Sequence, residues 1–113
     1  MNRNVQAPRP IAQMLAAALV AAGALHAAPA FANAELARAK NCMACHAVDK
    51  KLIGPSYRDV ATKYAADRAA VQKLSAKIRN GGVGVWGQIP MPANPQVSEA
   101  EAGRLAAWVL GQR

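Results

Sequence analysis

The sequence predicts a small all-α domain, with about four short helices around one long loop. Apolar residues recur at helical spacing in residues 57–64, in residues 67–80 and after Ser98, whereas no segment alternates as a strand would. Residues 81–97 instead change to a composition rich in Gly and Pro. A loop of that length inside a compact domain is usually functional.

An N-terminal segment has to be separated from this domain. The first ten residues contain two arginines and no acid, and residues 11–25 form an apolar run that is short for a bilayer span. Small residues follow, and Ala30-Phe31-Ala32 fits the A-x-A pattern of a signal-peptidase site. We therefore expect a secretory signal peptide over residues 1–32 and a mature domain over residues 33–113.

Other interpretations of this segment remain open. Cleavage after Ala30 competes with cleavage after Ala32, because Ala28-Pro29-Ala30 also fits the pattern. An uncleaved membrane anchor or a core helix would explain the apolar run as well. Cleavage would leave no stable membrane anchor, and Asn33 would become the new N-terminus.

The charge of the mature domain is strongly positive. Residues 33–113 hold twelve basic and six acidic residues, a net charge of +6. Nucleic-acid binding is not expected, because an exported protein rarely meets nucleic acid and no run interleaves Lys or Arg with aromatic residues. The charge instead favours encounters with acidic partner surfaces.

Two helices are predicted in the first half of the domain. Residues 34–42 are rich in good helix formers and predict a helix that runs into a cysteine pair. Residues 50–56 contain adjacent Gly and Pro and predict a loop. Residues 57–64 then carry apolar side chains at i, i+3, i+4 and i+7, which indicates one buried stripe: Tyr57, Val60, Ala61 and Tyr64.

Two further helices complete the domain. We expect Asp67 to cap a third helix, and Asn80-Gly81-Gly82 to end it with a left-handed residue. The inner face of this helix should hold Val71, Leu74 and Ile78. Ser98 and Glu101 form a capping-box pattern that opens the last helix. That helix is expected to bury Leu105, Trp108 and Val109.

A domain of about 80 residues rarely folds on its hydrophobic core alone. The mature chain has four aromatic residues with which to build that core: Tyr57, Tyr64, Trp86 and Trp108. An additional covalent or cofactor link is therefore expected, and the two cysteines are the obvious place for it.

The cysteines lie in Cys42-Met43-Ala44-Cys45-His46, the C-x-x-C-H pattern of c-type haem attachment. Two thiols three positions apart can each form a thioether with one porphyrin vinyl group, and the next residue presents an imidazole to the iron. A thioredoxin-like dithiol would need a βαβ neighbourhood, and a zinc site would need four ligands, whereas the mature chain has two Cys and one His. A disulfide between Cys42 and Cys45 is the outcome expected if haem attachment fails.

A haem bound by His46 needs a second axial ligand or leaves the iron open. The mature chain has two methionines, and Met43 lies inside the attachment motif, from which it cannot reach the opposite haem face. Met91 is therefore the candidate, although a lone Met is more often core filler. It stands between Pro90 and Pro92, which restrict the backbone around it.

Several motifs in one order resemble a known family across residues 33–113. After the C-x-x-C-H motif come Ile53-Gly54-Pro55-Ser56-Tyr57-Arg58-Asp59-Val60, a segment from Gly84 to Asn94 that contains Trp86 and Met91, and Ala107-Trp108-Val109-Leu110. This order is similar to that of the small class I bacterial cytochromes c of the c-551 (c8) type. The resemblance implies a class I cytochrome c fold wrapped around one haem.

The resemblance also implies roles for individual residues. One haem c would be attached covalently through two thioethers, from Cys42 and Cys45. His46 and Met91 would be the axial ligands of its iron.

A second group of residues would support the haem and its ligands. The Pro55 carbonyl would accept a hydrogen bond from the His46 ring, and Asn94 would contact the Met91 sulfur. Trp86 would donate to a haem propionate. Lys77 stands where the family often has an Arg facing a propionate, and it cannot form the bidentate contact of an arginine.

The function that follows is single-electron transfer, not catalysis. The resemblance implies a monomeric periplasmic carrier that receives electrons from cytochrome bc1-type donors and passes them to cytochrome cd1 nitrite reductase or terminal oxidases. A haem enzyme such as a small peroxidase, or a gas sensor, would need a labile sixth position and a polar distal pocket. A fixed subunit of a larger complex is a third alternative, which purification of the soluble protein alone would argue against.

Overall fold

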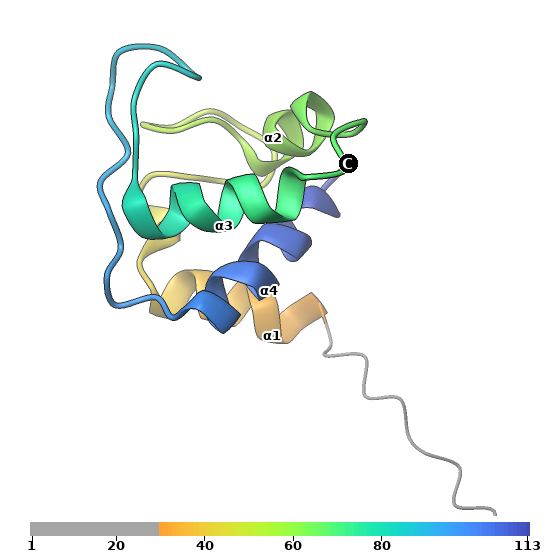
Figure 1. Cartoon of the computed structure of the whole chain (residues 1–113), viewed down its shortest axis with the longest axis vertical. Helices are drawn as coiled ribbons and strands as arrows, with labels where there is room; N and C mark the ends of the chain where they lie inside the picture. Colours follow the sequence, from red (N-terminus) through yellow and green to blue (C-terminus); the bar gives the residue numbers. More distant parts are fainter. Residues whose placement is uncertain (1–29) are drawn as a thin grey trace, which may run out of the picture.

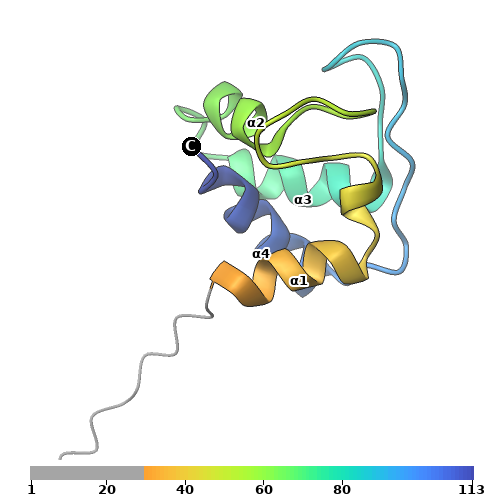
Figure 2. The same ribbon diagram turned by 180° about the vertical axis from the view of Figure 1, so that it is seen from behind.

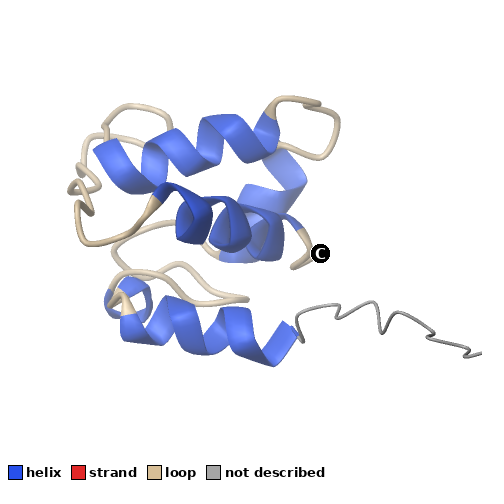
Figure 3. Cartoon of the chain, turned by 60° about the horizontal axis from the view of Figure 1, so that its bottom comes forward, coloured by secondary structure: helices blue, strands red, loops and turns tan. Residues whose placement is uncertain are grey.

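The computed structural model describes residues 30–113 of the chain. Within them it contains four α-helices and one 3₁₀ turn. In chain order they are α1 (Ala30–Ala39), η1 (Cys42–Ala44), α2 (Tyr57–Lys63), α3 (Ala70–Asn80) and α4 (Glu99–Leu110) (Figure 1). Within these residues there is no strand, and one isolated antiparallel bridge joins Gly82 to Met91 (Figure 3). The predicted all-α fold with four helices is confirmed.

The predicted signal peptide lies outside the described residues except for its last three positions. Residues 30–32 belong to the first turn of α1. The cleavage site therefore stays a prediction. Within residues 30–113, none of the helices combines the length and the apolar character needed to span a bilayer.

The first helix ends earlier than the predicted residue 42. Its regular part stops at Ala39, and Asn41 takes a left-handed conformation with φ of 64°. Asn adopts this conformation more easily than most residues, because its short polar side chain tolerates it. The chain thereby turns, and the cysteine pair begins in the separate 3₁₀ turn η1.

The second helix begins and packs as predicted. Ser56 is its N-cap, and the Ser56 hydroxyl accepts a hydrogen bond from the Asp59 N–H at 3.0 Å. The predicted stripe is buried at Tyr57, Val60 and Ala61, while Tyr64 is half-buried just beyond the helix end.

The start of α3 differs from the prediction. Asp67 is not its N-cap; Asp67 Oδ1 accepts a hydrogen bond from the Ala69 N–H at 2.9 Å in the turn that precedes the helix. Val71 is not part of the inner face either, since 42% of it is exposed. Ala70 and Leu74, four residues apart, are buried instead, so the packed face is centred one residue earlier.

The end of α3 also has its own geometry. Gly81 has the expected positive φ of 69°, but its ψ of −164° is extended and not left-handed helical. A Cβ at Gly81 would collide with the Met91 carbonyl oxygen. The glycine therefore lets the loop backbone pass directly against the helix end.

The last helix opens with the predicted capping box. Ser98 Oγ accepts from the Glu101 N–H at 3.1 Å, and Glu101 Oε2 accepts from the Ser98 N–H at 2.9 Å. Leu105 is buried as predicted, but Trp108 and Val109 are only half-buried. Small residues fill the rest of the buried face: Ala102 and Ala106.

Helix α4 is the centre of the packing, since it contacts α1, α2 and α3. It lies between α1 and α3 in both opposite views (Figures 1 and 2). One buried cluster joins it to α1 and to the end of the long loop: Ala37, Val97, Ala102 and Leu105. A second joins it to α2 and α3: Val60, Leu74 and Ala106. The long loop arches outside these helices, from the end of α3 to the start of α4.

Candidate functional site

One cavity of about 370 Å³ opens between the cysteine motif, the helices and the long loop. Its volume lies within the range of roughly 300–1,000 Å³ typical of cofactor clefts. Much of its lining is apolar, including Val60, Leu74, Ile78 and Leu105. All but one of the predicted site residues line it: Cys42, Cys45, His46, Pro55, Lys77, Trp86 and Met91. The exception is Asn94.

The imidazole of His46 is fixed from two sides. Nδ1 lies 2.8 Å from the Pro55 carbonyl oxygen, which can only accept, so Nδ1 carries the proton and donates. The ring also stacks on Tyr57 with centroids 5.3 Å apart. This tautomer leaves a lone pair on Nε2, the form in which a histidine binds a metal.

Gly54 is a further residue of the site, for which the sequence predicted a position in a loop but no role of its own. A Cβ at this position would collide with the His46 ring and would lie 2.8 Å from Nδ1. The Gly54 N–H also donates to the Cys45 carbonyl at 2.8 Å. The loop can therefore fold flat against the imidazole only with glycine here. The glycine before Pro55 was visible in the sequence, but the reason for it is its close contact with the His46 ring, which only the folded structure shows.

The two thiols lie in the same wall of the cavity. Cys42 and Cys45 are half-buried and are not bonded to each other. Burial raises the pKa of the Cys42 thiol, and burial also raises the pKa of the Tyr57 phenol beside His46. Both directions indicate a poorly hydrated wall, which favours uncharged groups and an apolar occupant.

Met91 is held at the cavity by its backbone. The Gly82 N–H donates to the Met91 carbonyl at 3.0 Å, and the Met91 N–H donates to the Gly82 carbonyl at 2.8 Å. This pair ties the returning arm of the loop to its outgoing arm. The Met91 side chain is half-buried and lines the cavity from a segment far from His46 in sequence.

Asn94 supports the loop from outside the cavity. Its Nδ2 donates to the Ile78 carbonyl at 2.9 Å and to the Pro92 carbonyl at 3.3 Å, and its N–H donates to the Arg79 carbonyl at 3.1 Å. These bonds fasten the segment after Met91 to the end of α3. Because the Asn94 amide already donates to two carbonyls, the expected contact with the Met91 sulfur stays a prediction.

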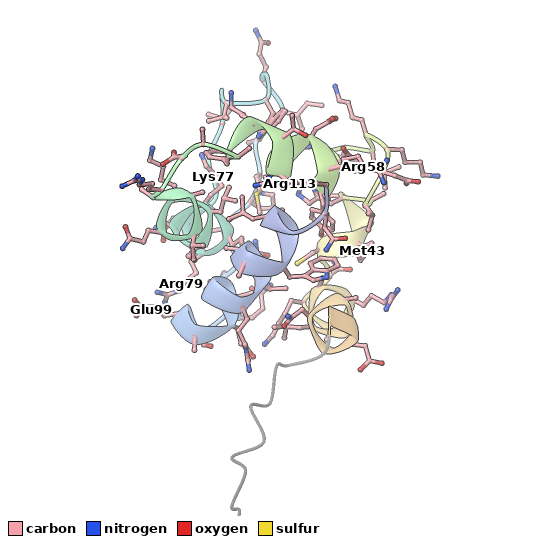
Figure 4. All side chains as sticks on the ribbon, turned by 90° about the vertical axis from the view of Figure 1, so that its right-hand side faces the viewer. Met43, Arg58, Lys77, Arg79, Glu99 and Arg113 are labelled. Atoms are coloured by element: carbon pink, nitrogen blue, oxygen red, sulfur yellow. The ribbon has the colours of Figure 1, made fainter. Side chains whose placement is uncertain are left out.

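Two residues stand at the polar edge of the cavity. Trp86 is 43% exposed near the tip of the loop. Lys77 comes from the last turn of α3, as does Arg79, and both are labelled in Figure 4. Lys77 lines the cavity and lies against Gly82, whereas Arg79 lines a separate surface groove between α3 and α4. Of these two basic residues of α3, Lys77 is therefore the one that lies at the cavity.

Comparison with known proteins shows the family of this chain. The family model for cytochrome c matches residues 31–112. The chain belongs to the cytochrome c family. Cytochrome c-551 of Azotobacter vinelandii is 58% identical over 76 residues, which are 67% of this chain and 92% of that protein. Cytochrome c-552 of Hydrogenobacter thermophilus is 56% identical over 81 residues, 71% of this chain and 81% of that protein.

A solved structure supports the fold of this cytochrome c domain. The crystal structure of wild-type Nitrosomonas europaea cytochrome c552 superposes with a TM-score of 0.70 at 50% identity, covering 71% of this chain and 99% of that one. The class I cytochrome c fold expected from the motifs is confirmed. The chain is a monohaem electron carrier that exchanges electrons with redox partners, and its cofactor is covalently bound haem c.

The residues of the cavity fit this cofactor. Two thiols, an imidazole that donates from Nδ1 to the Pro55 carbonyl and a thioether all line one mainly apolar cleft. They are the donors that haem attachment and His/Met ligation require. In the described part of the chain, no cluster of three or more His, Cys, Asp or Glu side chains is arranged to hold a metal ion.

Proposed function

We propose that this monohaem carrier works in the periplasm, with His46 and Met91 as the two axial ligands of its iron. The observation that carries the proposal is the shared cavity. Two segments far apart in sequence bring an oriented imidazole and a thioether to the same cleft as the two thiols. When bound, the haem supplies a one-electron couple between Fe(II) and Fe(III).

Each residue of the motif has a separate task. Cys42 and Cys45 anchor the macrocycle by thioethers, which keeps it bound in both oxidation states. His46 offers Nε2 to the iron, while Pro55 accepts the Nδ1 proton and fixes the plane of the ring. Such an acceptor raises the basicity of a histidine ligand.

Met91 determines the kind of chemistry. A thioether ligand favours the ferrous state and raises the reduction potential. As a ligand, Met91 would leave no open iron position for a substrate, so the bound haem would supply electron transfer alone. The proposed function is therefore electron transfer and not catalysis.

The polar edge of the cavity would hold the propionates. We assign the Trp86 indole N–H as a donor to one of them and the Lys77 ammonium as a charge partner. Lys77 is half-buried, so its charge is less screened than that of a fully exposed lysine.

The partners are proposed from charge and resemblance. The mature domain carries +6 over residues 33–113, which favours acidic docking surfaces. We propose that the monomer takes electrons from cytochrome bc1-type donors and delivers them to cytochrome cd1 nitrite reductase or a terminal oxidase. The signal-peptide pattern at residues 1–32 supports the periplasm as its location. N-terminal sequencing of the exported protein should begin at Asn33.

Ionic strength tests the docking proposal. The rate of electron transfer to purified cytochrome cd1 nitrite reductase should fall about tenfold or more between low and high salt, because salt screens the attraction. Reduction of a neutral small-molecule oxidant is the control, and its rate should change little. Equal rates to the reductase at low and high salt would contradict docking by positive charge.

A further inference from the structure

Lys63 and Trp86 meet above the cavity although they come from different parts of the chain. The Lys63 ammonium nitrogen lies 5.5 Å from the centroid of the Trp86 ring. Lys63 is in the last turn of α2, and Trp86 lies near the tip of the long loop. That tip is turned toward α2 in both opposite views (Figures 1 and 2). The pair therefore bridges α2 and the loop.

The loop around Trp86 has little packing to hold it. Every residue from 83 to 90 is exposed. Gly84 and Gly87 have positive φ values of 102° and 112°, and a Cβ at either would meet no atom within 4 Å. One hydrogen bond, from the Gly84 N–H to the Gly87 carbonyl at 2.9 Å, closes the turn on which Trp86 sits. With so few contacts inside the loop, the contact of Trp86 with Lys63 on α2 is important for holding the indole in place.

A lysine over an indole face is suited to this task. The ammonium is attracted by the negative face of the ring, and tryptophan is the strongest aromatic partner for it. The contact uses the ring face and leaves the indole N–H at the edge free to donate. Lys63 can therefore hold Trp86 without competing for its hydrogen bond.

We propose that Lys63 is a positioning residue, which holds the Trp86 indole over the polar edge of the haem cleft. The proposal rests on the assignment of Trp86 as a propionate donor. Without Lys63 the loop tip opens more often, the indole leaves the propionate and water reaches the haem edge. Solvent exposure is one of the factors that set the potential of a haem protein.

Hydrogen exchange in the ferrous holoprotein tests this proposal. Lys63→Met keeps most of the side chain and removes its charge. It should speed exchange of the Gly84 amide about two- to fivefold, the factor that corresponds to one exposed cation–π contact. The midpoint potential should fall as well. Lys63→Arg should restore both, because a guanidinium makes the same contact. Arg104→Met, with the same charge change on the exposed surface of α4, should leave the Gly84 amide unchanged.

A double variant separates positioning from charge. In a Trp86→Leu background there is no ring to hold, so adding Lys63→Met should change neither Gly84 exchange nor the potential further. An undiminished shift in that background would show a direct charge effect and overturn the proposal, as would unchanged Gly84 exchange in Lys63→Met. Failure of the axial-ligand assignment is seen separately, as a missing methionine–iron band in the wild-type spectrum.

Discussion

The helices and the long loop are held in place by different means. On α4, Ala102, Leu105 and Ala106 are at most 2% exposed, and they pack against the three other helices. In the loop, residues 83–90 are all exposed, although this segment leads to Met91. Backbone pairing with Gly82 and the hydrogen bonds of Asn94 hold the loop instead.

The buried helices therefore determine the stability of the domain, whereas the loop determines the position of Met91. Apolar burial between the helices is a large favourable contribution to folding, so its loss should destabilise the whole domain. The loop positions Met91 through a few polar contacts. Loss of these contacts should therefore release Met91 before the helices unfold. Each variant below tests one side of this comparison.

The largest stability effect is expected in the helical core. Leu105→Ala removes a side chain that is 2% exposed and joins α4 to α1 and the loop end. It should lower the free energy of unfolding by about 2–5 kcal/mol. Chemical denaturation of the holoprotein, followed by far-UV circular dichroism, measures this loss.

Val71→Ala is the matched control on α3. Because Val71 is 42% exposed, its truncation should cost no more than about 0.5 kcal/mol. A loss as large as that of Leu105→Ala would mean that Val71 belongs to the core, as helical periodicity alone suggested.

A smaller and more local effect is expected in the loop. Asn94→Ala removes the side-chain hydrogen bonds to the carbonyls of Ile78 and Pro92. Each bond contributes about 1 kcal/mol. The methionine–iron band should therefore disappear at lower denaturant than the helical signal does, whereas the two transitions should lie closer together in the wild type.

Gln96→Ala is the control for this variant, since the exposed Gln96 amide donates only to the Asn94 side chain among the described residues. It should leave the order of the two transitions unchanged. Coincident transitions in Asn94→Ala would show that loop and helices unfold as one unit.

The smallest effect is expected at the start of α4. The Ser98 N–H, and then the Lys40 ammonium at 3.1 Å, lower the pKa of the Glu101 carboxyl below its usual 4.5. A lowered pKa in the folded state gives stability above the unfolded-state pKa that is lost as pH falls through the folded value. Glu101→Gln should therefore destabilise slightly at pH 7 and progressively less below about pH 4.5.

Thermal unfolding of the holoprotein from pH 3 to pH 7 measures this dependence. Glu99→Gln is the control, because Glu99 lies in the same first turn but its side chain makes no hydrogen bond or ion pair within residues 30–113. A gap between wild type and Glu101→Gln that stays constant over the whole range would exclude a role for the Glu101 charge.

The sequence predicted best what local patterns determine. The capping box of α4 and the buried stripe of α2 follow from neighbouring residues. The burial of Ala70 in place of Val71 does not, because both share a helical face with Leu74 and only the packing on α4 decides between them. Local composition likewise placed the end of α1 three residues too late, because the left-handed turn at Asn41 interrupts a run of good helix formers.

The candidate site divides in the same way. C-x-x-C-H is local and recognisable, and elimination among two methionines pointed to Met91. Other contacts of the site form only in the folded chain. Gly54 leaves room for the His46 ring, Asn94 bonds to the end of α3, and Lys63 lies over Trp86. Periodicity and propensity contain no information on such contacts.

Ligation by Met91 is the central claim, and optical spectroscopy of Met91→Ala tests it most directly. The matched control is Met43→Ala, because Met43 packs on the core beside α1 and does not line the cavity. Met91→Ala should lose the weak far-red band of the ferric protein, bind carbon monoxide in the ferrous state and show a lower reduction potential, while Met43→Ala keeps the wild-type spectrum. A wild-type protein that already binds carbon monoxide readily, with spectrum and potential unchanged in Met91→Ala, would contradict the claim.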